Sequence, residues 1–245
     1  MIQIDRPGYG ASDALSADES PSVERFADDI AEYLRSINNE ASSLSDLNFG
    51  PASAIGWSFG GYVAAALAAR HPDLVDRLVI VATARPRRLQ SGERFSIIAE
   101  LRKHGVERGF EGLRASLKDD GAPSLLQLGI DDADPALATL GVRGQLDRSL
   151  EAGWTQDAAG VAFDRLAVRD HDWLAVADHV DVSTLLVYGA EDVLAEEKDA
   201  RWFEHHIRDS ALVTAPDAGH LVLLPEWARI LDFVSERAEP TSDEA

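Results

Sequence analysis

Short apolar runs alternate with helical patterns at both ends of this 245-residue chain. Ala52–Gly56 and Leu78–Ala82 have the pattern of short buried strands, and Phe59–Arg70 between them is rich in helix-forming residues. Continuous apolar runs are typical of strands covered on both faces. A strand–helix–strand order predicts parallel pairing, because parallel neighbours need a crossover connection. We therefore expect an α/β fold with a mostly parallel sheet flanked by helices.

The first fifty residues extend this alternation. Ile2–Asp5 is predicted to form a short strand that runs into a turn over Arg6–Gly10. Ser22 is placed to cap an amphipathic helix that continues to Ile37. The polar stretch Asn38–Pro51 is interpreted as a connector.

The same alternation returns near the C-terminus. The expected elements are a strand at Thr184–Tyr188, a helix at Glu196–Ile207, a strand at Ala211–Thr214 and a helix at Glu226–Arg237. Residues 85–181 between the two halves show helical periodicity, with Ile97, Ile98 and Leu101 on one predicted face, but no convincing strand. We expect residues 1–84 and 182–240 to form the α/β core, 85–181 to form a helical cap, and 241–245 to be an acidic tail.

Composition narrows the possible functions. The chain has no cysteine, which excludes disulfides, thiolate metal sites and a cysteine nucleophile. Its formal net charge of −20 disfavours binding to nucleic acids or anionic membranes. The longest apolar run, Tyr62–Ala69, is too short to span a bilayer, and no signal peptide is visible. We expect a cytoplasmic protein that uses no metal or cofactor and acts on a small molecule; its oligomeric state is left open.

The sequence Gly56-Trp57-Ser58-Phe59-Gly60-Gly61 matches the pattern G-x-S-x-G between a predicted strand and a predicted helix. In that context the serine lies on a tight turn that exposes its hydroxyl beside the free N–H groups of a helix N-terminus. Taken alone, the pattern also suits a glycine-rich turn that only joins the two elements.

A serine hydroxyl needs a base, and the base needs a carboxylate that fixes its tautomer. Among the seven histidines, His220 follows the last predicted strand, where functional residues collect in an open α/β sheet. Asp192 follows the strand at 184–188, and Asp217 is the alternative acid. Ser58, Asp192 and His220 each follow a different predicted strand, and we expect them to converge at one sheet edge.

The chain resembles the α/β-hydrolase superfamily along nearly its whole length. The resemblance rests on the motifs Asp5–Ser12, Gly56–Gly61, His71–Asp73 with Arg77–Val79, Tyr188–Asp192 and Gly219–His220. It is strongest to bacterial hydrolases that carry a helical cap, near the esterase and proline-iminopeptidase branches.

The resemblance implies a serine hydrolase that cleaves a carboxylic ester or related acyl bond. It assigns Ser58 as nucleophile, His220 as base, Asp192 as acid and the Phe59 N–H as an oxyanion donor. Trp57 and Phe59 flank the nucleophile and suit either pocket lining or core packing. Perhydrolase and carbon–carbon hydrolase activities use the same three groups and remain open.

The start of the chain departs from the family pattern. In the family, further strands and a His-Gly turn that supplies a second oxyanion donor precede the segment that here begins at Asp5. We therefore expect an N-terminally truncated form, in which strand 2–5 either pairs directly with strand 52–56 or is separated from it by a gap. The alternative function is a truncated or degenerate hydrolase that is inactive or acts only as a binding protein.

Overall fold

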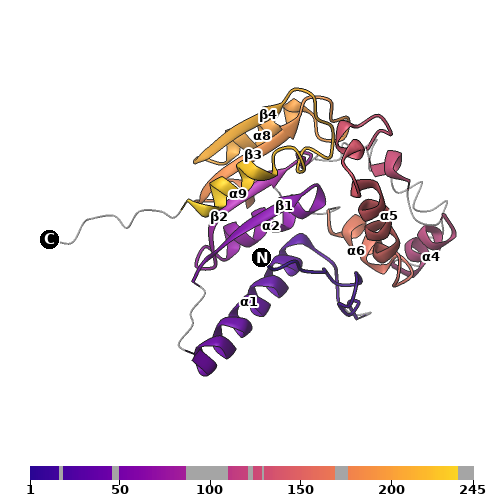
Figure 1. Cartoon of the computed structure of the whole chain (residues 1–245). Helices are drawn as coiled ribbons and strands as arrows, with labels where there is room; N and C mark the ends of the chain where they lie inside the picture. The colour runs from indigo at the N-terminus through magenta and orange to yellow at the C-terminus, as the bar shows by residue number, and fades with distance from the viewer. Residues whose placement is uncertain are drawn as a thin grey trace.

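A four-stranded parallel sheet lies at the centre of the protein (Figure 1). The computed structural model describes residues 1–16, 19–45, 50–86, 110–120, 124–128, 130–168 and 176–236. The strands follow one another across the sheet in chain order: β1 (Ala52–Trp57), β2 (Val75–Val81), β3 (Ser183–Gly189) and β4 (Ser210–Ala215). The predicted α/β fold with a parallel sheet is confirmed.

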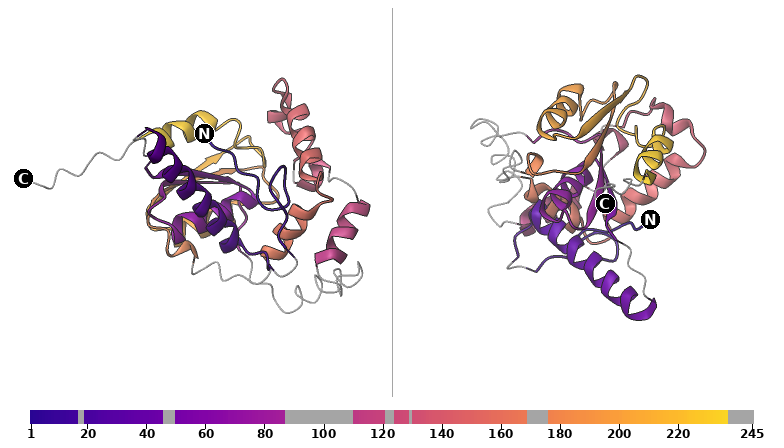
Figure 2. Two further views of the ribbon diagram at one scale, coloured as in Figure 1. Left: turned by 90° about the horizontal axis from the view of Figure 1, so that it is seen from below. Right: turned by 90° about the vertical axis from the view of Figure 1, so that its left-hand side faces the viewer.

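Helices cover both faces of this sheet (Figure 2). Helices α2 (Phe59–Arg70) and α8 (Glu197–His206) lie on one face, and α9 (Trp227–Ser235) lies on the other. Helix α1 (Val23–Ser45) packs on the outside of α2. Ser22 caps α1 as predicted, since the Arg25 backbone N–H donates to its hydroxyl at 3.1 Å.

The parallel register brings the strand ends to one edge. Trp57 pairs with Val81, Val81 pairs with Val187, and Gly189 pairs with Ala215. The core is centred on β2 and β3, whose residues from Leu78 to Val81 and from Leu185 to Tyr188 are almost fully buried. Burial of these two strands holds the loops that follow them in fixed positions.

The described parts of residues 85–181 are helices and turns, and they contain no strand. They comprise α4 (Phe110–Asp120), η2 (Leu125–Leu128), η3 (Pro135–Ala138), α5 (Val142–Gly153) and α6 (Ala159–Ala167). Figure 1 shows α4, α5 and α6 gathered together beside the sheet. The predicted helix face at Ile97, Ile98 and Leu101 and the acidic tail at 241–245 lie outside the described residues.

The predicted strand at Ile2–Asp5 is wrong. These residues form no ladder, and all of them except Ile4 are exposed. An extended segment is stable as a strand only when a neighbour accepts and donates its backbone hydrogen bonds. Strand β1 pairs with β2 alone among the described strands, so the expected direct pairing of 2–5 with 52–56 does not occur.

The predicted connector at Asn38–Pro51 is also partly wrong, because α1 continues to Ser45. Extending an existing helix by one residue costs far less free energy than starting a new one. Polar residues of ordinary helix propensity can therefore continue the helix. The cap and the amphipathic pattern up to Ile37 therefore predicted where α1 begins but not where it ends.

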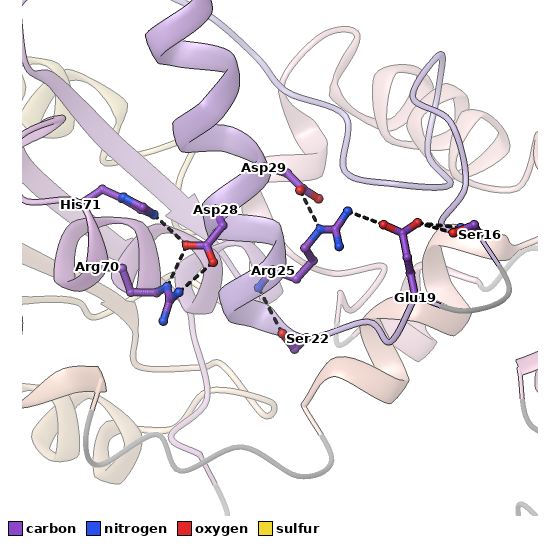
Figure 3. A network of polar contacts seen from close by, with 8 residues as sticks. All are labelled: Ser16, Glu19, Ser22, Arg25, Asp28, Asp29, Arg70 and His71. Atoms are coloured by element: carbon purple, nitrogen blue, oxygen red, sulfur yellow. Dashed lines mark hydrogen bonds and ion pairs between the residues drawn. The ribbon is translucent and has the colours of Figure 1, made fainter.

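An ion-pair network joins α1 to the end of α2 (Figure 3). Asp28 accepts from Arg70 Nε at 2.9 Å and Nη2 at 2.7 Å, and its carboxyl lies 2.7 Å from His71 Nε2. The hydrogen bonds from Arg70 are the main reason that the pKa of Asp28 lies below its ordinary value of 3.8. The ionised form of Asp28 is therefore favoured in the folded protein.

We predict that Asp28→Asn lowers the free energy of unfolding near pH 7 by up to about 1 kcal/mol, since the pair is partly exposed. A lowered folded-state pKa stabilises the protein above the unfolded-state pKa, and this contribution is lost as the pH falls through the folded-state value. The difference from the parent protein should therefore be constant above about pH 5 and shrink below about pH 4. Urea unfolding across this pH range measures it. Glu32→Gln, an exposed change on the same helix, is the control, and a difference that persists at low pH would contradict the assignment.

Candidate active site

Ser58 lies on the turn between β1 and α2, half-buried and in a left-handed backbone conformation with φ of 53°. Its N–H donates to the Val81 carbonyl at 2.9 Å, which ties the turn to the end of β2. The turn is so tight that a Cβ on Gly56 would lie 2.3 Å from the Gly60 carbonyl oxygen. Glycine at position 56 is therefore a steric requirement of this strand-to-helix turn.

Asp192 lies in the loop after β3 and is 5% exposed. One of its carboxylate oxygens accepts the backbone N–H groups of Leu194 at 2.8 Å and Ala195 at 3.1 Å. These two bonds fix the carboxylate and leave its second oxygen, Oδ2, to face His220. The neighbouring Glu191 is exposed.

The loops after β3 and β4 pack directly on each other. The Glu191 N–H donates to the Ala218 carbonyl at 3.0 Å, and a Cβ on Gly189 would lie 2.1 Å from the same oxygen. This close approach brings His220, which is 3% exposed, beside Asp192. Asp217, the alternative acid, is exposed.

The three side chains form one chain of hydrogen bonds. His220 Nδ1 lies 2.8 Å from Asp192 Oδ2, and His220 Nε2 lies 3.0 Å from Ser58 Oγ. An ionised carboxylate only accepts hydrogen bonds, so Nδ1 carries the proton and Nε2 accepts from the Ser58 hydroxyl. The structure therefore brings together the three residues selected from the sequence.

Trp57 contacts His220 in two ways. Its indole N–H donates to the His220 carbonyl at 2.8 Å, and the two rings lie 5.3 Å apart. Trp57 also packs in a cluster that contains Leu221 together with Leu125 and Ile130 of the 85–181 segment. It therefore packs in the apolar interior and also holds the backbone of the candidate base.

The Phe59 ring lies 6.5 Å from the Phe26 ring of α1 and 5.8 Å from the Tyr62 ring of its own helix, α2. Its backbone N–H is at the first position of α2 and has no acceptor within the helix. The side chain of Phe59 thus belongs to the packing beneath the turn, while its N–H is available at the turn itself.

A partly buried ion pair that the sequence did not reveal lies against Phe59. Arg6 Nε donates to Asp164 at 3.1 Å, Tyr9 donates its hydroxyl to the same carboxylate at 2.8 Å, and the guanidinium lies 4.8 Å from the Phe59 ring. Burial lowers the pKa of Arg6, but the attraction and hydrogen bonding of Asp164 outweigh burial and raise it. Arg6 and Asp164 are so far apart in sequence that no local pattern could link them.

Two other described histidines contact carboxylates outside this constellation. His71 contacts Asp28, and His206 lies 3.0 Å from Asp178 on the surface of α8. Within the described residues, no group of three or more His, Asp or Glu side chains is arranged to hold a metal ion. His104 and His171 lie outside the described residues.

The fold and the glycine-rich serine turn are those of the alpha/beta hydrolase fold, whose family profile matches residues 1–226. The chain therefore belongs to the α/β-hydrolase family, as the sequence resemblance predicted. A relative from Chromobacterium violaceum, named pimeloyl-(acyl-carrier protein) methyl ester esterase, is 31% identical over 250 residues, which cover 99% of this chain and 84% of that protein.

Two solved structures illustrate the likeness in fold. A hydrolase from Pseudomonas aeruginosa PA01 has a TM-score of 0.63 and 24% identity, covering 95% of this chain and 78% of that one. An esterase from Exiguobacterium antarcticum has a TM-score of 0.66 and 19% identity, covering 95% and 80%. These two likenesses show the fold alone, whereas the relative at 31% identity is itself named an esterase. Among the described residues, no helix is long and apolar enough to cross a membrane.

We predict that Gly61→Ala destabilises the protein whereas Gly60→Ala does not. A Cβ on Gly61 would lie 2.0 Å from Thr83 Oγ1, while one on Gly60 meets nothing within 4 Å. Overpacking of this kind costs about 1–3 kcal/mol, and an unhindered Gly→Ala change in a helix gains up to about 1 kcal/mol. Urea unfolding of both variants measures the difference. Equal stabilities would show that Thr83 does not lie against α2 as described.

Proposed function

We propose that this chain is a serine esterase that hydrolyses carboxylic esters through an acyl-enzyme intermediate. Ser58 is the nucleophile, His220 the general base and Asp192 the acid that orients it. The observation that carries the proposal is the unbroken line of hydrogen bonds from Asp192 through His220 to the Ser58 hydroxyl, at 2.8 and 3.0 Å. The esterase name of the 31% identical relative supports an ester as the substrate.

In the first half of the reaction, Ser58 Oγ attacks the ester carbonyl carbon as His220 Nε2 takes the hydroxyl proton. The carbonyl π electrons move onto oxygen, and Asp192 stabilises the imidazolium that forms. Collapse of this intermediate expels the alcohol, which receives the proton from His220. Water, deprotonated by His220, then attacks the acyl-enzyme and releases the acid and free Ser58.

The developing oxyanion needs hydrogen-bond donors in place before the reaction begins. The Phe59 N–H supports this role because it lies at the start of α2, directly after the nucleophile, and has no acceptor within the helix. The positive end of the α2 dipole points toward the same place. Phe59 therefore contributes to the oxyanion site through its backbone N–H, and its ring anchors the turn by packing near Phe26 and Tyr62.

We further propose that residues 85–181 cap the acyl pocket. Leu125 and Ile130 from this segment pack in one apolar cluster with Trp57 and Leu221, the residues next to Ser58 and His220. An apolar wall beside the nucleophile suits the acyl chain of a small ester better than a charged group. The methyl ester in the name of the relative points to a small alcohol as the leaving group.

We predict that Asp192→Asn lowers kcat for p-nitrophenyl and methyl esters by about 10⁴-fold, because it leaves the base in the wrong tautomer. Glu191→Gln, a change at the exposed neighbouring position, should keep kcat within about twofold of the parent protein. Ser58→Ala should reduce hydrolysis to background. Steady-state kinetics on a panel of acyl chain lengths measures all three variants.

Two outcomes would contradict the proposal. If the parent protein hydrolyses no ester on the panel faster than Ser58→Ala, the chain acts as a binding protein or on another class of substrate. If Asp192→Asn retains the parent kcat while Ser58→Ala loses it, Asp192 is not the acid of this site.

A further inference from the structure

Two residues with positive φ lie at neighbouring strand ends, and one of them is the candidate nucleophile itself. Ser58 and Ala82 have φ of 53° and 47°, and each follows the last paired residues of its strand. The Ser58 N–H donates to Val81 at 2.9 Å, and the Ala82 N–H donates to Val187 at 2.9 Å. Non-glycine residues keep this costly conformation only where the surroundings hold them. The ends of β1, β2 and β3 are therefore locked to one another at this point.

Thr83 connects the ends of β1 and β2 through its side chain. It is fully buried, and its hydroxyl lies 2.9 Å from the Ser58 carbonyl oxygen and 3.1 Å from that of Val81. The Gly61 N–H also donates to the Ser58 carbonyl, at 3.1 Å. The Ser58 carbonyl is thus held by a hydroxyl from β2's end and by an amide from α2.

The Ser58 carbonyl and the Phe59 N–H belong to the same peptide unit. A trans peptide is planar, and its C=O and N–H point in opposite directions. Any group that fixes the direction of the Ser58 carbonyl therefore fixes the direction of the Phe59 N–H. A hydrogen bond accepted by the carbonyl also polarises the N–H of the same unit.

Tyr188 in β3 holds Thr83 in turn. Its hydroxyl donates to the Thr83 carbonyl at 2.7 Å, and the side chain is fully buried. Burial, with a smaller contribution from Asp199, raises the pKa of Tyr188 well above its ordinary value, so the hydroxyl stays protonated and continues to donate. Thr83 is therefore fixed at both its backbone and its side chain.

We propose that Thr83 is a positioning residue that aims the Phe59 N–H at the oxyanion through its hydrogen bond to the Ser58 carbonyl. The inference rests on the proposed esterase function and adds a residue that touches neither substrate nor the reacting atoms. Its effect is specific to the transition state, because the oxyanion exists only there.

Thr184 provides a matched control for an ordinary structural hydroxyl. Like Thr83 it is buried, and its Oγ1 donates to the Val182 carbonyl at 2.9 Å. It lies at the start of β3, at the opposite edge of the sheet from Ser58. Thr184→Val removes a comparable hydrogen bond without touching the nucleophile turn.

The kinetic test compares Thr83→Val, Thr83→Ser and Thr184→Val on one ester. Thr83→Val should lower kcat about tenfold or more with KM changed less than about twofold, since a misaligned donor weakens transition-state binding only. Thr83→Ser keeps the hydroxyl and should restore kcat to within about threefold of the parent protein. If Thr83→Val and Thr184→Val lose kcat equally, or if serine gives no rescue, the positioning role is wrong.

Hydrogen exchange tests the same inference without relying on catalysis. In Thr83→Val the peptides that span residues 57–62 should exchange several-fold faster, while Thr184→Val leaves them unchanged. If Thr83→Val does not fold, Tyr188→Phe takes its place, because it loosens Thr83 without altering its hydroxyl. The same peptides should then exchange faster than in the parent protein, by a smaller factor than is expected for Thr83→Val. Unchanged exchange in these peptides would overturn the inference. An inactive parent protein with faster exchange in Thr83→Val would instead contradict the esterase function alone.

Discussion

The parallel pairing of β1, β2 and β3 is the constraint on which the rest of the structure depends. Parallel strands all end at the same edge, so the loops that follow them meet even when they are far apart in the sequence. Ser58 follows β1, Asp192 follows β3, and His220 follows β4. The strand register brings these strand ends to the same edge of the sheet. The buried apolar residues of β2 and β3 hold the strands in that register.

Burial of the polar groups at this edge is tolerated because each has a partner. A buried carboxylate is costly unless its oxygens accept hydrogen bonds. Asp192 meets this condition with two backbone N–H groups on one oxygen and His220 on the other. The same logic applies to Arg6 and Asp164, which are held with the Tyr9 hydroxyl against the Phe59 ring. Polar groups that are fully paired fix one arrangement of the loops, and this rigidity benefits a site that must be ready before the substrate binds.

The sequence predicts those parts of the fold that depend on local pattern. The bounds of α2 and the positions of all four strands followed from apolar runs and breakers, and the strand ends selected Ser58, Asp192 and His220. The strand predicted at Ile2–Asp5 is wrong because a strand needs a partner, and the local sequence pattern does not show whether one is present. Thr83 was missed because one hydroxyl after a buried run gives no sign of the carbonyl it contacts. Its only signal was a polar residue two positions after the end of β2, at the edge where the functional residues gather.

Covalent labelling of Ser58 by a fluorophosphonate tests the central claim most directly, because the reagent reacts with a serine only where a base and an oxyanion site activate it. We expect mass spectrometry to find one phosphonyl group per chain, located on the peptide that contains Ser58. The label should be absent from Ser58→Ala and strongly slowed in Asp192→Asn. An unlabelled parent protein, or a label on a different serine, would contradict the assignment of Ser58 as an activated nucleophile.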